Sequence, residues 1–218
     1  MKIFGLVIMS IFSLTAMTQP INKNEQVSYL ALGDSYTIGE SVPEHERWPV
    51  QLVKLLNAKG YRIEASRIIA TTGWRTDDLK NAVDNAGLSN DYGLVSLLIG
   101  VNNQYQGKSV ESYKPEFEGL LKKAIELAGG RKERVFVVSI PDYGFTPFGE
   151  PKKEEISKAI DAFNQANREI TLRYGIRYYY ITDLTRKGLE QPHLVAADKL
   201  HPSGAMYTRW AELIASDF

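Results

Sequence analysis

The sequence contains no cysteine, and this absence excludes several kinds of site. Disulfide bonds, thiolate zinc sites and a cysteine-linked lipid anchor all need a thiol. The chain also lacks an excess of charge of either sign, because Lys and Arg together number 26 and so do Asp and Glu. Without a positive surplus the chain has no field that would gather a phosphate backbone, so we expect no nucleic-acid partner.

Long apolar runs are missing as well, except at the N-terminus. Lys2 is followed by an uncharged stretch over residues 3–17 and then by small and polar residues. A charged start, a short apolar segment and small residues at a cleavage point are typical of a signal peptide, and a spanning helix would need ~20 apolar residues. We therefore expect residues 1–18 to be a signal peptide and the protein to be exported, to the periplasm or outside the cell. A membrane contact is expected only if this leader stays uncleaved.

The remaining residues, 19–218, are enough for one well-buried core and too few for two, so we expect a single domain. Short apolar runs lie at residues 29–32, 67–71, 94–100, 135–140 and 176–181, and segments of helical period lie at 48–56, 113–128, 156–174 and 205–214. This alternation predicts the α/β class, with a mostly parallel five-stranded sheet covered on both faces. Pro115, near the start of the second helical segment, is expected to open or kink that helix.

Polar and aromatic residues follow the predicted strands. They are Ser35, then Gly73-Trp74-Arg75, then Asn102-Asn103-Gln104-Tyr105, then Pro141-Asp142-Tyr143. Parallel strands present their carboxyl ends at one edge of the sheet, where α/β proteins bind their ligands. We therefore expect these four segments to converge on one site.

Gly33-Asp34-Ser35 directly follows the first apolar run, so the strand would deliver the serine hydroxyl to that edge. A serine hydroxyl becomes a good nucleophile when an imidazole takes its proton and a carboxylate orients the imidazole. Asp198 and His201 are three residues apart, close enough in a turn for the carboxylate to reach one ring nitrogen. Pro202 favours such a non-helical conformation at His201. The alternative is that Asp198 caps the last helix and His201 is a surface residue.

Acyl transfer also needs hydrogen-bond donors for the developing oxyanion. Gly73 has no Cβ, so its N–H can approach a substrate closely, and Asn102 can offer a side-chain N–H. The alternative for each is an ordinary turn residue.

Four blocks of this sequence, in this order, resemble the SGNH hydrolases, also called the GDSL esterase/lipase family. The blocks are Gly33-Asp34-Ser35, Gly73, Gly100-Val101-Asn102-Asn103 and Asp198-Lys199-Leu200-His201. The resemblance covers essentially the whole chain after the leader. It implies a three-layer α/β/α sandwich with a flavodoxin-like sheet, and it implies neither a metal nor an organic cofactor.

The resemblance also implies a role for each matching residue. Ser35 would be the nucleophile, His201 its base and Asp198 the partner of His201. The N–H groups of Ser35 and Gly73 and the side chain of Asn102 would form the oxyanion hole. A Gly-x-Ser-x-Gly elbow is absent around Ser35, which argues against the α/β-hydrolase fold.

One position departs from the family pattern. The third block usually ends in Asp, and this chain has Asn103. Asn has nearly the shape of Asp but donates as well as accepts, so the hydrogen bonds that hold the Asn102 loop should differ from the family's. The predicted donor, Asn102, is itself unaffected.

The expected function is that of a serine esterase that forms an acyl-enzyme, acting on small acyl esters or on O-acetylated carbohydrates. Two alternatives stay open: a lysophospholipase or thioesterase acting on longer chains, and a noncatalytic module that binds a glycan or a partner on the same fold. Trp74, Arg75, Tyr105 and Tyr143 are candidates for lining the substrate pocket. The acidic segments lack the spacing of a calcium loop, so we expect no metal site. The sequence leaves the natural ester, the acyl length and the oligomeric state open.

Overall fold

The computed structural model describes residues 21–218, and the signal peptide expected at residues 1–18 lies outside the described residues. The strands are β1 (Gln26–Val27), β2 (Tyr29–Gly33), β3 (Arg62–Ile63), β4 (Arg67–Ala70), β5 (Leu94–Leu98), β6 (Val135–Val138) and β7 (Arg177–Tyr179). The α-helices are α1 (Ser35–Ile38), α2 (Trp48–Ala58), α3 (Thr76–Asn85), α4 (Val101–Tyr105), α5 (Val110–Leu127), α6 (Lys153–Arg173), α7 (Thr182–Thr185) and α8 (Gly204–Ala215). Short 3-10 helices are η1 (Glu44–Glu46), η2 (Lys132–Arg134), η3 (Tyr143–Phe145), η4 (Glu150–Lys152) and η5 (Pro192–Leu194). Within this part of the chain, every helix is too short or too polar to cross a membrane.

Five strands form the central sheet in the order β4-β2-β5-β6-β7, and every neighbouring pair is parallel. Numbered along the chain, this is the 2-1-3-4-5 order of flavodoxin-like sheets. Strands β2, β5 and β6 are buried along their whole length, as expected of strands covered on both faces. The predicted five-stranded parallel sheet is therefore confirmed.

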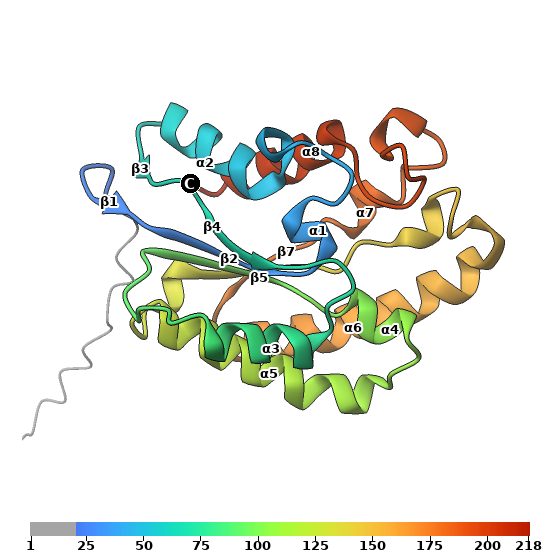
Figure 1. Ribbon diagram of the computed structural model, residues 1–218, viewed down its shortest axis with the longest axis horizontal. Coiled ribbons are helices and arrows are strands. Elements are labelled where there is room, and N and C mark those ends of the chain that lie inside the picture. Colours follow the sequence, from blue (N-terminus) through green and yellow to red (C-terminus); the bar gives the residue numbers. More distant parts are fainter. Residues whose placement is uncertain (1–20) are drawn as a thin grey trace, which may run out of the picture.

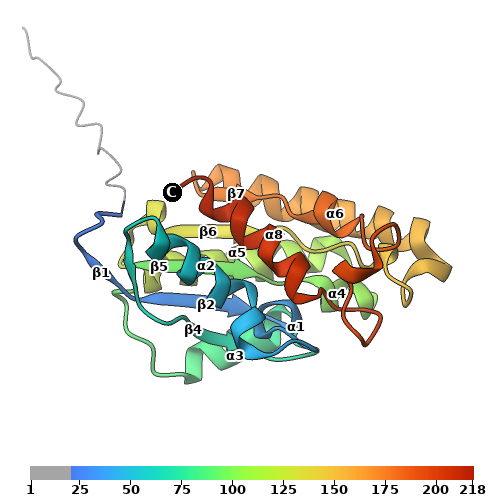
Figure 2. The same ribbon diagram turned by 90° about the horizontal axis from the view of Figure 1, so that it is seen from above.

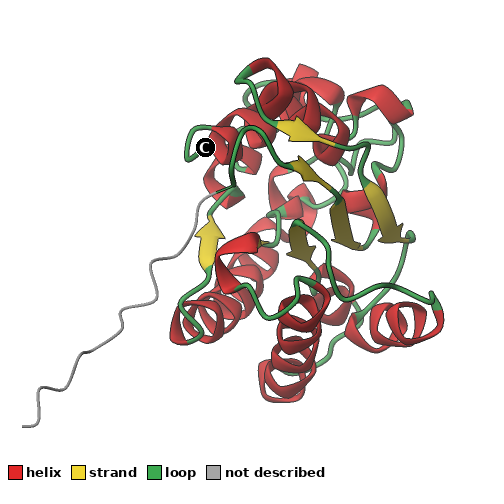
Figure 3. Ribbon diagram, turned by 90° about the vertical axis from the view of Figure 1, so that its left-hand side faces the viewer, coloured by secondary structure: helices red, strands yellow, loops and turns green. Residues whose placement is uncertain are grey.

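Helices cover both faces of the sheet (Figures 1 and 3). Helices α2 and α8 lie together on one face, as the view from above also shows (Figure 2). Helices α3, α5 and α6 lie on the other face. The apolar stripe of α2 places Trp48, Leu52 and Leu56 in the core, and Tyr207 and Trp210 of α8 are equally buried.

Helix α3 and the short helices α1, α4 and α7 lie outside the four predicted helical segments, and two further details differ from the sequence expectations. Helix α5 begins at Val110, where the Ser109 side chain caps it by accepting from the N–H of Ser112, so Pro115 lies inside the helix and does not open it. Strands β1 and β3, which were not predicted, form a separate parallel pair. Each is only two residues long, too short to show an alternating pattern.

The strand order determines where a ligand site can form. Strands β2 and β5 are neighbours in the sheet. The chain passes from β2 to β4, on one side of this pair, and from β5 to β6, on the other side. A crevice opens at such a switch point, outside the carboxyl ends of the strands. Ser35 follows β2 and Asn102 lies just beyond β5, so both predicted site residues sit at this point.

Candidate active site

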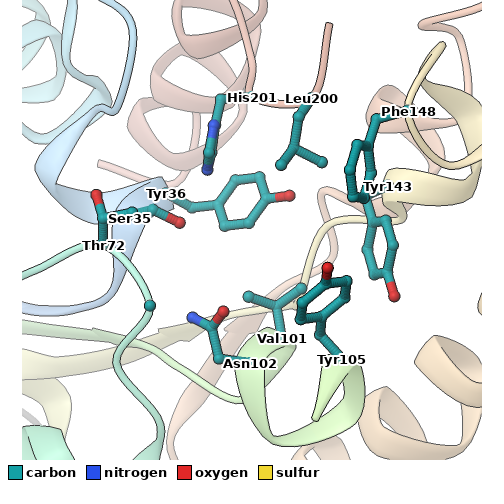
Figure 4. Close-up of a pocket in the computed structure, with 11 residues that line it drawn as sticks. Ser35, Tyr36, Thr72, Val101, Asn102, Tyr105, Tyr143, Phe148, Leu200 and His201 are labelled. Carbon is teal, nitrogen blue, oxygen red and sulfur yellow. The ribbon is translucent and has the colours of Figure 1, made fainter. Parts of the chain in front are cut away.

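A cavity of about 280 Å³ lies at the switch point (Figure 4). We call it the main cavity. It is lined by Ser35, Tyr36, Thr72, Gly73, Val101, Asn102, Tyr105, Tyr143, Phe148, Leu200 and His201. These residues come from the segments after four different strands and from the loop before α8, which are far apart in the sequence.

A sharp turn from strand β2 into helix α1 presents Ser35 to the cavity. Asp34 caps α1, because its Oδ1 accepts from the N–H of Tyr36 at 3.0 Å. Gly33 is required by crowding, since a Cβ there would lie 2.6 Å from the carbonyl oxygen of Leu98 and closer still to Thr37. Ser35 thus becomes the first residue of α1, and its N–H has no partner within the helix.

Asp198 and His201 form a directly bonded pair. The Nδ1 of His201 lies 2.6 Å from Oδ2 of Asp198, and Oδ1 accepts from the backbone N–H groups of Leu200 and His201, each at 2.9 Å. The hydroxyl of Ser41 donates to Oδ2 at 2.7 Å. Partial burial pushes the pKa of Asp198 upward, but these hydrogen bonds outweigh it and lower the pKa to about 2. The carboxylate is therefore ionised across the physiological range.

The bond from Ser41 could not be found from the sequence. Ser41 and Asp198 are 157 positions apart, and a lone serine after a helix carries no motif. Ser41 has a backbone φ of 66°, a left-handed conformation that is uncommon for residues other than glycine. The preceding residue, Glu40, accepts a hydrogen bond from Thr72, which lines the main cavity beside Gly73.

The ring of His201 points into the main cavity on the side of Ser35 (Figure 4). The His201 ring also packs against the ring of Tyr36, with the ring centroids 5.1 Å apart. The hydrogen bonds found within residues 21–218 include none between the Ser35 hydroxyl and His201, although both line the same cavity. Such bonds are often loose in enzymes without substrate and tighten in the Michaelis complex.

Gly73 and Asn102 also line the cavity, and Asn102 lies across it from His201 (Figure 4). The Nδ2 of Asn102 donates one hydrogen to the carbonyl of Trp74 at 2.9 Å, which orients the amide and leaves its second hydrogen available. Gly73 has a φ of 86°, so a residue with a Cβ would be strained there. No acceptor for the N–H of Gly73 is present in the described chain.

Asn103 does not face the cavity but holds the loop that carries Asn102. Its Oδ1 accepts from the N–H of Thr76 at 3.1 Å, and its Nδ2 donates to the hydroxyl of Thr76 at 2.6 Å. Glu116 completes this network, at 3.4 Å from Nδ2 and in direct hydrogen-bond contact with Thr76. Asn suits the position because it can donate toward a neighbouring carboxylate, which an ionised Asp could not do.

Asp34 has a very different environment from Asp198. It is fully buried, and its Oδ2 has no hydrogen-bond partner in the described residues. Burial raises the pKa of Asp34 to about 7, against the opposing effect of the N–H of Tyr36. Burial, together with the nearby Asp34, also raises the pKa of Tyr36 well above its ordinary value, so the Tyr36 phenol stays neutral.

The four residues expected to line the substrate pocket divide into two pairs. Tyr105 and Tyr143 line the main cavity, whereas Trp74 and Arg75 do not. Arg75 instead forms an ion pair with Asp77 at 2.6 Å and donates to Gln106 at 2.6 Å, so its charge is already satisfied. Phe148, whose aromatic ring makes it a candidate as well, lines the cavity, and so do Tyr36, Thr72, Val101 and Leu200, which were not predicted as pocket residues. Within residues 21–218, no cluster of three or more His, Asp or Glu side chains could hold a metal ion.

Comparisons with known proteins place this arrangement in a family. Residues 31–209 match the model of the GDSL-like lipase/acylhydrolase family. No curated protein matches the chain. Among solved structures the chain resembles TesA (TM-score 0.68, 16% identity, covering 86% of this chain and 95% of the other).

Two further solved structures share the fold. One is a lipase/acylhydrolase from Enterococcus faecalis (TM-score 0.67, 18% identity, covering 88% and 95% of the two chains). The other is Axe2, an acetylxylan esterase from Geobacillus stearothermophilus (TM-score 0.66, 17% identity, covering 88% and 93%). The resemblance predicted from four sequence blocks is thus confirmed over most of the chain. The protein belongs to the GDSL-like lipase/acylhydrolase family of hydrolases.

Proposed function

We propose that the protein is a serine ester hydrolase in which Ser35, His201 and Asp198 form a catalytic triad. His201 takes the proton of the Ser35 hydroxyl through Nε2 while the serine oxygen attacks the ester carbonyl. Asp198 accepts from Nδ1, so it holds the ring in the tautomer that leaves Nε2 free to act as base. The imidazolium then gives its proton to the departing alcohol, and an acyl group remains on Ser35. Water, activated by the same imidazole, releases the acid.

The negative oxygen of the tetrahedral intermediate needs donors that are already in place. The backbone N–H groups of Ser35 and Gly73 and the free amide hydrogen of Asn102 are available for this purpose. They come from three different segments at one side of the main cavity. Since each is held by the backbone or by a hydrogen bond, little reorganisation is needed when charge develops.

One observation carries the proposal. A buried imidazole is bonded at Nδ1 to an ionised carboxylate 2.6 Å away, and it lines the same cavity as the serine at the turn after β2. A structural histidine at the surface would have no reason to share a cavity with unpaired backbone donors. The noncatalytic alternative would leave this arrangement without a use.

The main cavity favours a small acyl group. Its inner side is closed by Tyr36 and Leu200, and beyond them lies only a space of about 20 Å³. The structural neighbour Axe2 is an acetylxylan esterase, which agrees with this acyl size, although the likeness extends to the fold alone. We therefore place acetyl and other short acyl esters ahead of long-chain lipids, and we propose that the enzyme acts after export.

The test uses p-nitrophenyl esters from acetate to decanoate with the wild type and Ser35→Ala. We expect the wild type to hydrolyse acetate and butyrate best and Ser35→Ala to lose at least ~10³-fold in kcat, leaving only the contribution of binding and the oxyanion donors. Ser89→Ala, an exposed serine in the loop before β5, is the matched control and should behave as the wild type. Equal hydrolysis by the wild type and Ser35→Ala would refute the proposal.

A further inference from the structure

Three aromatic rings form a wall at the outer side of the main cavity. Tyr105, Tyr143 and Phe148 contact one another with ring centroids 6.1 to 6.4 Å apart. Tyr105 and Phe148 are 59% and 49% exposed, and no large hydrophobic side chain in the described chain is more exposed than Tyr105. Exposed aromatic side chains that gather beside a cavity form an apolar patch, and such patches mark binding surfaces. Figure 4 shows the three rings on the side of the cavity away from Ser35.

The same three rings line a second hollow, of about 430 Å³, on their other side. We call it the outer hollow. Its further lining residues are Gln104, Gly107, Gly149, Pro151, Lys152, Glu155 and Ile156. One extended molecule bound across the aromatic wall could therefore occupy both spaces.

The wall is held in place by hydrogen bonds and close packing. The Tyr143 hydroxyl donates to Oε1 of Gln104 at 2.9 Å, and the N–H of Phe148 donates to the carbonyl of Lys199 at 3.1 Å, within the loop that carries Asp198 and His201. Gly149 packs so tightly that a Cβ there would meet the carbonyl oxygen of Tyr143. A surface held in this way loses little conformational entropy when a ligand binds.

The two spaces differ in chemistry. The main cavity has the apolar side chains of Val101 and Leu200 around its polar catalytic groups, whereas the outer hollow has Lys152 and Glu155. Neither Lys152 nor Glu155 forms an ion pair or side-chain hydrogen bond with any residue from 21 to 218. A hydrocarbon chain lying there would remove water from both charges without replacing its hydrogen bonds, which is unfavourable. A molecule with several hydroxyl groups would replace them.

From this contrast we infer that the outer hollow is a subsite for the saccharide part of an O-acylated carbohydrate. The inference rests on the proposed function, because the short acyl group would occupy the main cavity with its carbonyl at Ser35. The C–H face of the sugar ring would pack on Phe148 and Tyr105. Its hydroxyl groups would hydrogen-bond to Lys152, Glu155 and Gln104. The scissile ester would then lie at Ser35, and the saccharide would extend from there past the aromatic wall into the outer hollow.

The experiment compares two substrates in one ratio. Release of acetate is measured from mono-O-acetylated gluco-, xylo- and galacto-oligosaccharides, and kcat/KM is divided by the value for p-nitrophenyl acetate. We expect the double variant Lys152→Ala/Glu155→Ala to lower this ratio at least tenfold for the preferred saccharide, and Phe148→Ala to lower it similarly through loss of the stacking face. The double variant removes one charge of each sign, so the net charge is unchanged. Circular dichroism and thermal unfolding check that each variant is folded.

Glu154→Ala is the matched control, because Glu154 lies beside Glu155 on α6 but its side chain is 86% exposed and pairs only with its neighbour Lys153. Its ratio should equal that of the wild type. The inference is overturned if wild type that hydrolyses p-nitrophenyl acetate through Ser35 releases acetate from none of the saccharides. It is also overturned if the ratio of the double variant stays within twofold of the wild-type ratio. A third contradicting outcome is that Phe148→Ala impairs only the hydrolysis of long-chain p-nitrophenyl esters, which would assign the outer hollow to an acyl chain. Loss of the Ser35 dependence would instead refute the proposed function.

Discussion

Asp34 and Asp198 are two carboxyl groups beside the same cavity, and they behave in opposite ways. Asp34 is fully buried with one oxygen unpartnered, and its pKa is raised to about 7. The side chain of Asp198 is 29% exposed and accepts four hydrogen bonds, and its pKa is lowered to about 2. The comparison shows that exposure and the number of donors together determine which carboxyl group is charged. Only Asp198 is equipped to stabilise an imidazolium.

The largest expected effect is on activity, which Asp198→Asn should lower far more than Asp34→Asn does. Asp198→Asn should lower kcat by ~10³- to 10⁴-fold, because an amide no longer holds His201 in the required tautomer. Asp34→Asn should cost less than about tenfold, since an amide oxygen can still accept from the N–H of Tyr36 and cap α1. Hydrolysis of p-nitrophenyl acetate by the two purified variants measures both. Comparable losses would show that Asp34 also acts in catalysis.

A second prediction concerns stability and pH at Asp34. Its pKa is about 7 in the folded state and ~3.9 in an unfolded chain, so the native state holds a proton that the unfolded state has lost between these values. The free energy of unfolding of the wild type should therefore fall, relative to Asp34→Asn, by up to ~1.4 kcal/mol per pH unit from about pH 4 to pH 7, and then level off. Urea denaturation of both proteins at several pH values measures this difference. Asp91→Asn, at an exposed loop position, is the control, and a difference that is constant with pH would contradict the raised pKa.

The substitution Asn103→Asp adds a third carboxyl group to the comparison of Asp34 with Asp198. The new acid would face Glu116 with only the hydroxyl of Thr76 to donate between them, so one carboxylate oxygen would lose its donor. We expect a loss of ~1–3 kcal/mol in the free energy of unfolding at pH 7, which acidification should partly reverse. Asn103→Ser, which removes the amide without adding charge, separates lost hydrogen bonds from repulsion. Equal stability of Asn103→Asp and wild type would show that the loop tolerates either residue.

The smallest expected effect comes from removing one of the four donors to Asp198. Ser41→Ala should lower kcat about three- to tenfold with little change in KM, because Ser41 positions Asp198 and does not line the cavity. Ser41→Gly lacks the same hydroxyl but relieves the positive φ of 66°, so it should be as slow as Ser41→Ala and more stable. If Ser41→Gly were as active as the wild type, the backbone conformation and not the hydroxyl would be responsible.

Much of the fold could be predicted because its signals are local. The apolar runs of β2 and β5 mark buried strands directly, and the spacing of Asp198 and His201 lets the two side chains meet within one turn. The order of the four family blocks then identifies the family. Pro115 does not open α5, because a capping serine six residues earlier starts the helix.

The site was predictable only in part. Trp74 and Arg75 follow a strand and were expected in the pocket, but Arg75 finds Asp77 two residues away and turns from the cavity. Conversely, Leu200 lines the cavity without having been predicted, and its loop is joined to the aromatic residues by the hydrogen bond from the N–H of Phe148 to Lys199, fifty-one positions along the chain. A hydrogen bond of this kind cannot be predicted from the hydrophobic periodicity of the sequence.

The sequence by itself determined the alternation of strands and helices, the strand-to-helix turn that presents Ser35, and the pairing of Asp198 with His201, because each depends on residues a few positions apart. The tertiary structure decided the fourth donor to Asp198, the unpartnered oxygen of Asp34, and the aromatic wall between the main cavity and the outer hollow. These features depend on which loops meet once the sheet has formed. Contacts between residues that are far apart in the sequence leave no mark in the local hydrophobic pattern, since they are set by packing and hydrogen bonding in three dimensions.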